Sequence, residues 1–385
     1  MDISLNKTQR DIAKEARRFL KKECPMEFVK EMCEDERGFT EDIWKKMADM
    51  DWMAMRIPES YGGIGMDLMD LNMVLEEMGR TVFPGPFFST ILLAAEAIVA
   101  SGSDAQKDRY LPGIADGNLR GTLAMNEPDG GADTDYIQMA ARAEGDDFVL
   151  TGTKVSVPDA HVADVLVCAA RTESGNDPNK GITLFLVDPR EPGVSVSPLP
   201  TMDSTRKLCV VEFKGVRLGK ESILGERHRG WGTLKQVLQR AQIGLSAECV
   251  GGAERVMEIA TDYAKIRIQF NQPIGTFQAV KHRCAQMYLE AESARSLLYW
   301  GAWAQDYGDE KKAAVAASAV KSYCSETFTH NASGAIQVLG GTGFTLESEV
   351  HFYLKRAKGN EMALGDPAFH REQVMGLLQT NGIDK

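Results

Sequence analysis

The spacing of apolar residues changes twice along the chain, and this change constrains the fold more than any other feature. Residues 1–120 show helical spacing, as in "TEDIWKKMADMDWMAM", interrupted by the turn-rich "IPESYGGIGMD". In 121–229, short β-branched runs such as "GITLFLVDP" alternate with Gly, Pro, Asn and Asp. Helical spacing returns in 230–385. The sequence therefore predicts an α+β protein with an N-terminal helical domain, a middle antiparallel β domain and a C-terminal helical bundle domain, over these three ranges.

Several classes of protein are disfavoured by composition and order. Strands and helices do not alternate, which argues against a doubly wound dinucleotide-binding sheet. The net charge of -11 argues against nucleic acid or an anionic membrane as a partner. The most apolar run, "ILLAAEAIVA", is interrupted by Glu96 and is too short to span a bilayer. The seven dispersed cysteines lack metal-ligand spacing, so we expect a reduced, cytoplasmic protein without a metal.

Three glycine-containing segments could approach an anion or a flat ring: "MNEPDGGADT", "RIQFNQPIGTFQ" and "QVLGGTGF". The second segment also carries a guanidinium, an aromatic ring and two amides, at Arg267, Phe270, Gln269 and Gln278. These four residues fall within about three helical turns and suit a pyrophosphate and a purine. The alternative interpretation is an exposed helix end with a solvated arginine.

Taken in order, these segments and "IPESYGGIG" resemble the acyl-CoA dehydrogenase family, and the resemblance runs from about residue 5 to residue 380. It implies a flavoprotein whose C-terminal domain is a four-helix bundle and whose FAD lies between two subunits of a dimer, usually within a tetramer. By this resemblance, the adenine and pyrophosphate of FAD would contact Arg267, Gln269, Phe270, Gln278, Gln337, Val338, Gly340 and Gly341. Met125 and Asn126, in the first glycine-containing segment, are weaker candidates for the flavin side.

The resemblance also implies a glutamate that removes the α-proton of an acyl-CoA thioester, with electrons passing to an electron-transfer flavoprotein. Leu364 occupies the position of that glutamate here, followed by Gly365 and Asp366. Some relatives carry the base on an earlier helix, where this chain has Gln239 and then Arg240. Neither leucine nor glutamine can accept a proton at neutral pH. Both usual positions of the catalytic base are therefore empty.

Two carboxylates remain near the vacant position. Asp366 is a weak candidate for the catalytic base, and its favoured alternative role is to cap a helix that begins at "PAFHRE", since Asp before Pro is a common start signal. Glu361 lies about one helical turn before the vacant position. We interpret Glu361 as a solvated side chain.

A second set of departures falls on the flavin side of the expected site. Ser156, Val157, Pro158 and Asp159 stand where the family usually has Trp-Ile-Thr-Asn. Pro158 offers neither a hydroxyl nor an N–H donor. Asn126 and Ala132 likewise replace a threonine and a serine of the family. The positions that depart from the family's pattern are thus Asn126, Ala132, Ser156, Pro158, Leu364 and Asp366. The adenosine side keeps its residues, so losses are confined to one half of the expected site.

This division supports a first hypothesis, a subunit of a heteromeric acyl-CoA dehydrogenase whose related partner supplies the flavin pocket and the base. Such enzymes act on steroid side chains or dicarboxylic acyl-CoAs. A second hypothesis is a homo-oligomer with Asp366 as a relocated base, acting on a cyclic or otherwise unusual acyl-CoA. A third is a non-catalytic family member that keeps the fold. The acyl group itself is not specified by the sequence.

Overall fold

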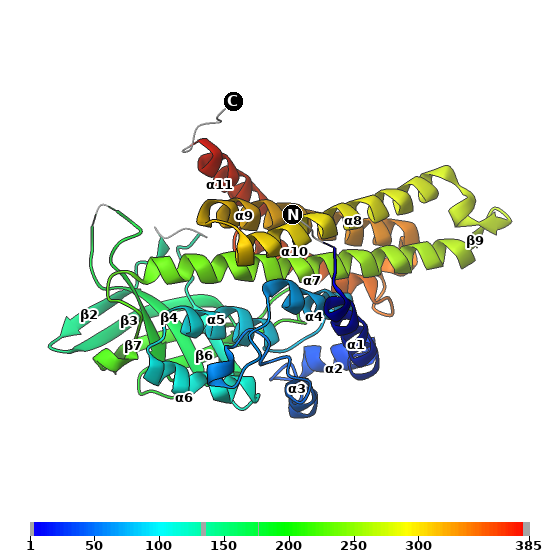
Figure 1. Ribbon diagram of the computed structural model, residues 1–385. Coiled ribbons are helices and arrows are strands. Elements are labelled where there is room, and N and C mark those ends of the chain that lie inside the picture. Colours follow the sequence, from blue (N-terminus) through cyan, green and yellow to red (C-terminus); the bar gives the residue numbers. More distant parts are fainter. Residues whose placement is uncertain (1–3, 132–135, 176, 380–385) are drawn as a thin grey trace. The chain divides into compact units, whose positions relative to one another are not determined.

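The computed structural model describes residues 4–131, 136–175 and 177–379 (Figure 1). The chain divides into two compact units. Unit one takes the residues up to Glu31, Leu68–Phe83 and the residues from Gln242 onward. Unit two takes Met32–Asp67 and Pro84–Ala241. Each unit therefore combines segments from different parts of the chain, and the three-domain division by sequence order stays a prediction.

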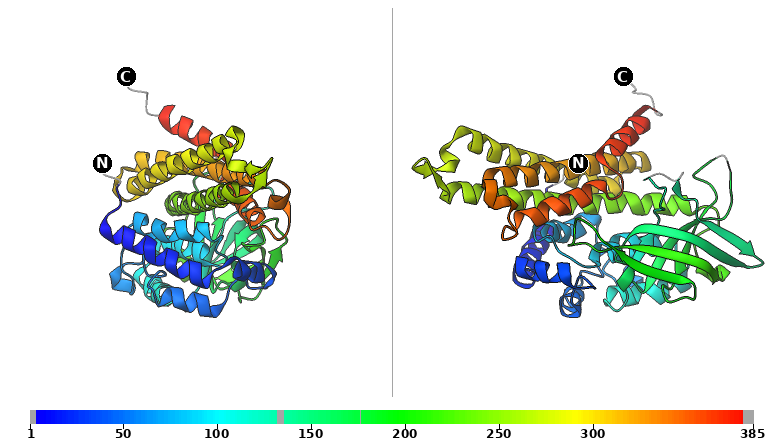
Figure 2. Two further views of the ribbon diagram at one scale, coloured as in Figure 1. Left: turned by 90° about the vertical axis from the view of Figure 1, so that its right-hand side faces the viewer. Right: turned by 180° about the vertical axis from the view of Figure 1, so that it is seen from behind.

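Unit two is built around one sheet, in which the strands run in the order β6-β7-β3-β2-β4-β5-β8 and β1 pairs with β4. The strands are β1 Gly121–Ala124, β2 Ala140–Glu144, β3 Asp147–Pro158, β4 Val165–Arg171, β5 Ile182–Val187, β6 Val194–Leu199, β7 Leu208–Leu218 and β8 Ile223–Leu224. Their arrows lie together in the view from behind (Figure 2). The named strands of this sheet pair antiparallel, as predicted, except that β4 pairs in parallel with β1 and β2.

The core of this sheet explains the β-branched and aromatic runs of the sequence. Strands β4 and β5 are buried at every position, which is why their residues read as continuous apolar runs rather than alternating ones. Phe148 and Phe185 pack with ring centroids 5.3 Å apart. Unit two also holds helices α3 Glu41–Ala48, α5 Glu96–Ser101 and α6 Asp104–Ala115, with a buried π-helical segment η2 over Ser89–Ala95.

Unit one is helical. Its helices are α1 Lys7–Glu23, α4 Leu68–Arg80, α8 Gln278–Tyr307, α9 Glu310–Leu339, α10 Val350–Met362 and α11 Pro367–Gln379. Helix α7, Gly230–Ile266, begins in unit two and continues through unit one, while α2, Met26–Glu34, begins in unit one. Close contact between α4 and α7 requires glycine, because a Cβ on Gly251 would lie 1.8 Å from the backbone oxygen of Glu76.

Two observations bear on the broad class of the protein. Over the part of the chain that the structure describes, no helix is long and apolar enough to cross a membrane. All seven cysteines are free. Five of them are buried, whereas Cys33 and Cys284 are only partly covered.

Candidate functional site

The adenosine-side candidates gather around a hairpin at one end of unit one, where α7 and α8 are joined (Figure 1). Helix α7 ends at Ile266, and β9, Ile268–Gln269, pairs with β10, Gln272–Pro273. The turn residues Phe270 and Asn271 both have positive φ, at 52° and 62°, as in the tight turns that join antiparallel strands. The segment therefore forms a hairpin and not a stretch of helix. Asn271 favours this turn and Pro273 cannot continue a helix.

The side chains on this hairpin face outward. Arg267, Gln269, Phe270 and Gln278 are all exposed. Phe270 is 86% exposed, and its ring meets that of Phe277 edge-on at a centroid distance of 6.0 Å.

The second cofactor segment lies beside the first. Gln337 is exposed in the last turn of α9, whereas Val338 is buried, so its side chain belongs to the core. A Cβ added to Gly340 or Gly341 would meet nothing within 4 Å, so the backbone here is open to close approach. Thr342 Oγ1 donates to the Tyr263 hydroxyl at 3.3 Å, which joins this segment to the end of α7.

Large apolar side chains surround these candidates on the surface of unit one. They are Ile266 (75% exposed), Ile268 (60%), Phe270 (86%), Tyr288 (56%), Leu289 (59%), Phe344 (78%) and Leu346 (82%). Singly exposed apolar residues are ordinary, but a group of seven carried by the hairpin and the elements joined to it suggests an interface with another protein chain.

In unit two, the two flavin-side segments lie next to one another. The N–H of Val155 donates to the Asn126 carbonyl at 2.9 Å. Lys154, which is fully buried, donates to the Met125 carbonyl at 2.9 Å and pairs with Glu127 at 2.6 Å. The sequence had not singled out this buried ion pair. Ala132, the other departure in the first loop, lies outside the described residues.

The residues that replace Trp-Ile-Thr-Asn follow an irregular strand. Ser156 is exposed, has φ 52° and lies where the β3–β7 register shifts. Pro158 keeps its carbonyl engaged, because Thr122 Oγ1 donates to it at 2.6 Å. Asp159 is buried, and its carboxylate accepts from Ser89 Oγ at 2.6 Å. None of these side chains offers the indole or the threonine hydroxyl that the family has here.

The vacant position of the catalytic glutamate lies in a firmly held turn of unit one. Leu364 is partly buried and has φ 59°, an uncommon conformation for a side chain of its size. His370 Nε2 bonds its carbonyl at 2.9 Å. Lys321 Nζ donates to the carbonyls of Gly365 at 2.9 Å and Glu361 at 3.2 Å. Three hydrogen bonds therefore hold the carbonyls of the turn in which the resemblance places the base.

Two buried basic groups hold this turn, and burial alters both. It lowers the pKa of Lys321 to about 8. It also lowers the pKa of His370 to about 4, with a further decrease from the Lys321 charge. His370 is therefore neutral at pH 7, so Nε2 carries the proton that is donated to Leu364 while Nδ1 accepts from Ser318 Oγ at 3.3 Å. The sequence analysis had not identified Lys321, whose position within a helical run gives no signal of burial.

The two carboxylates beside the vacant position are both engaged. Asp366 accepts from the Phe369 N–H at 2.7 Å, which is the helix-capping role at the start of α11. The interpretation of Glu361 as solvated is wrong, because it is partly buried and accepts from Thr329 Oγ1 at 2.7 Å and Lys358 Nζ at 2.8 Å. Burial raises the pKa of Glu361, but hydrogen bonds from Lys358 and Thr329 lower it by more. The net result is a pKa below the ordinary value for glutamate. A catalytic base here would need the opposite shift.

The other position of the base lies beside a buried charge cluster in unit two. Gln239 is partly buried, and the next residue, Arg240, pairs with Glu96 at 2.6 Å. Arg56 pairs with the second oxygen of Glu96 at 2.7 Å. Burial raises the pKa of Glu96, yet the two guanidinium groups lower it overall. The lone charge in "ILLAAEAIVA" was the only sequence sign of this cluster.

Among the residues that the structure describes, no group of three or more His, Cys, Asp and Glu side chains could hold a metal ion.

Comparison with family models matches the chain along most of its length. Residues 6–118 match the model described as acyl-CoA dehydrogenase, N-terminal domain. Residues 122–216 match the middle domain of the same family, and residues 228–377 match its C-terminal domain.

Individual proteins give the same result. The chain is 31% identical over 350 residues to a 3-(aryl)acrylate reductase of Clostridium sporogenes, covering 88% of this chain and 90% of that protein. The butyryl-CoA dehydrogenase structure from Megasphaera elsdenii superposes with a TM-score of 0.91 at 26% identity, covering 98% of this chain and all of that one. A structure described as Tcur3481-Tcur3483 steroid ACAD superposes with a TM-score of 0.86 at 28% identity, covering 97% and 98%.

Proposed function

Because the chain belongs to the acyl-CoA dehydrogenase family, a family of FAD-dependent oxidoreductases, we propose that it supplies the adenosine side of an FAD site at the interface of a heteromeric acyl-CoA dehydrogenase. A related partner subunit supplies the flavin pocket and the catalytic base. The proposed reaction is α,β-desaturation of an acyl-CoA, with electron-transfer flavoprotein as the acceptor.

The observation that carries this proposal is the unequal state of the two halves of the expected site. On the adenosine side, Arg267, Gln269 and Gln278 are exposed, and within the described residues their side chains have no hydrogen-bonding partner. On the base side, Leu364 carries no titratable group and Asp366 already caps α11. The donors are therefore free where a cofactor would be held, and no free acceptor remains where a proton would be removed.

The exposed residues fit the adenosine and pyrophosphate of FAD. A guanidinium such as Arg267 binds phosphate oxygens through two parallel bonds. The Phe270 ring offers a face on which a purine stacks, and the open backbone at Gly340 and Gly341 allows a phosphate to approach closely. When bound, FAD supplies a flavin that accepts the β-hydride of the acyl group.

A bound acyl-CoA loses its α-proton only to a group that can accept it. Leu364 has no such group, and the Glu361 pKa is shifted away from the value a base requires. The proton therefore passes to a carboxylate of the partner subunit. For this chain, the proposed roles are to orient the adenosine and to close the interface through its exposed apolar residues.

The similar structure described as Tcur3481-Tcur3483 steroid ACAD bears two protein names, which supports a two-chain assembly for a relative. A bulky acyl group such as a steroid side chain is accordingly the substrate class we favour. The second candidate, a homo-oligomer with Asp366 as base, is disfavoured because the Asp366 carboxylate is already engaged in capping α11 through the Phe369 N–H.

The test is the ratio of flavin to chain together with the native mass, measured on the chain alone and after co-expression with related subunits. Little FAD alone and one FAD per pair of unlike chains is the expected result. One FAD per chain in a homotetramer active on acyl-CoA would contradict the heteromer. An FAD-free assembly under every condition would instead support a non-catalytic family member.

A further inference from the structure

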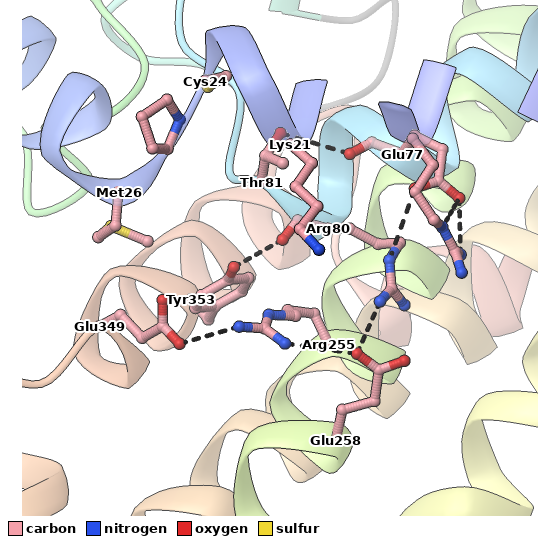
Figure 3. Close-up of a pocket in the computed structure, with 12 residues that line it drawn as sticks. Lys21, Cys24, Met26, Glu77, Arg80, Thr81, Arg255, Glu258, Glu349 and Tyr353 are labelled. Carbon is pink, nitrogen blue, oxygen red and sulfur yellow. Dashed lines mark hydrogen bonds and ion pairs between the residues drawn. The ribbon is translucent and has the colours of Figure 1, made fainter. Parts of the chain in front are cut away.

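Unit one contains a cavity that none of the residues discussed above lines (Figure 3). Its volume is about 440 Å³, within the range of roughly 300–1,000 Å³ that is typical of small-molecule sites. Its walls come from the ends of α1 and α4, the start of α2, the middle of α7 and the start of α10. We call it the α1–α10 cavity.

The walls of this cavity carry more positive than negative charge. Four lining side chains are cations: Arg17, Lys21, Arg80 and Arg255. Three are carboxylates: Glu77, Glu258 and Glu349. Glu254, which does not line the cavity, also pairs with Arg80 at 2.6 Å and with Arg17 at 3.9 Å, so the cluster as a whole is balanced in charge.

Ion pairs hold the guanidinium groups in fixed orientations. Arg17 bonds both oxygens of Glu77, at 2.8 Å and 3.0 Å, and Arg80 pairs with Glu258 at 2.6 Å. Arg255 pairs with Glu349 at 3.2 Å. Groups that are already ordered lose little conformational entropy when a ligand binds.

Donors are left over after these pairs have formed. Arg17 uses Nε and Nη2 for Glu77, and its Nη1 makes no hydrogen bond within the described part of the chain. Lys21 is exposed and has no carboxylate partner among the described residues. The adjacent Lys22, in contrast, pairs with Glu23 at 2.8 Å. The cavity therefore has a spare ammonium and a spare guanidinium nitrogen from the same helix, four residues apart.

We propose that the α1–α10 cavity binds a small molecule that carries a phosphate monoester. The doubly charged phosphate can accept hydrogen bonds from the Lys21 ammonium and from Nη1 of Arg17. Such bonds between charged groups are stronger than hydrogen bonds between neutral groups. Met26 and Pro25 supply apolar surface for the organic part of the ligand. This proposal does not depend on the heteromer or on the base.

The test is isothermal titration calorimetry with phenyl phosphate on the full chain. Wild type and the Lys22→Met variant bind with equal affinity, because Lys22 does not line the cavity. Lys21→Met loses the same charge from the neighbouring position and binds about tenfold more weakly, as expected for one lost charge-assisted bond. Lys21 is exposed, so the variant folds.

Two further measurements make the outcome decisive. Arg18→Met, at an arginine of α1 that pairs with Glu15 and does not line the cavity, keeps full affinity. Phenol, which has the same ring without the phosphate, binds far more weakly. The proposal is overturned by no detectable binding, by equal affinities of the two lysine variants, or by phenol binding as tightly as phenyl phosphate.

Discussion

At the scale of single residues, the proposed function depends on what Arg267 and Leu364 can and cannot do. Arg267 is exposed, and its side chain has no hydrogen-bonding partner among the residues that the structure describes. Leu364 keeps the backbone conformation of a functional turn without a functional side chain. Arg267 can therefore place a positive charge against a cofactor, whereas Leu364 has no group that can accept a proton from a substrate.

Replacing Arg267 tests the first of these statements. Arg267→Met in the co-expressed assembly removes a charge-assisted bond to phosphate, worth about 1.5–3 kcal/mol, and lowers FAD retention by about tenfold or more. FAD content after gel filtration measures the effect. Arg18→Met, at another exposed arginine of unit one, is the matched control and retains full FAD. Equal FAD content in the two variants would show that Arg267 does not bind the cofactor.

Asp366 can be tested by two substitutions that separate its roles. Asparagine caps helices about as well as aspartate, so Asp366→Asn leaves the melting temperature unchanged, whereas Asp366→Ala costs about 1 kcal/mol. Thermal unfolding measures both. In the heteromer proposal, Asp366→Asn also keeps acyl-CoA oxidation. Loss of activity in Asp366→Asn with unchanged stability would assign Asp366 as the base.

At the scale of elements, the turn between α10 and α11 is held from beneath by helix α9. Lys321 extends from α9 to two carbonyls of this turn, and His370 returns from α11 to a third. A buried lysine whose pKa falls to about 8 costs stability when charged. The hydrogen bonds from Lys321 to the Glu361 and Gly365 carbonyls offset part of this cost.

The pH dependence of stability follows from this lysine. Its folded-state pKa of about 8 lies below the ordinary value of 10.5, so between these values the unfolded chain binds more protons. The Lys321 contribution to the free energy of unfolding therefore rises as pH increases from about 8 to about 10. Urea unfolding of wild type against Lys321→Met measures it as a difference between the two pH curves. Parallel curves would show that Lys321 is not shifted.

Lys321→Met also leaves the carbonyls of Glu361 and Gly365 without their donor, which costs about 1–3 kcal/mol for each unsatisfied group. The variant is therefore less stable than wild type at pH 7. For this reason the two proteins are compared by how steeply the free energy of unfolding changes with pH, and not by its absolute value. Lys311→Met, at an exposed lysine on the same helix, is the control for loss of charge.

At the scale of the whole molecule, the exposed apolar residues around the hairpin are the expected subunit interface. Phe344 and Leu346 are 78% and 82% exposed and lie in the segment that follows the second cofactor candidates. Surface of this kind is covered in an assembled protein, because burial stabilises by about 25 cal/mol per Å² of apolar area.

Native mass spectrometry tests this interface. The double variant Phe344→Ser and Leu346→Ser shifts the assembly to smaller species and lowers FAD content at the same protein concentration. Met202→Ser, at a methionine that is 61% exposed in unit two, is the control and assembles as wild type. An unchanged mass in the double variant would place the interface elsewhere.

The sequence by itself determined the helical and strand regions, the cap of α11 at Asp366 and the family, because apolar spacing, caps and motifs depend on residues close together in the chain. The tertiary structure decided the parallel pairing of β4, the hairpin at Phe270 and the burial of Glu361 and Lys321. It also created the α1–α10 cavity. These features depend on which distant segments pack together, and a single sequence carries no local signal of such contacts.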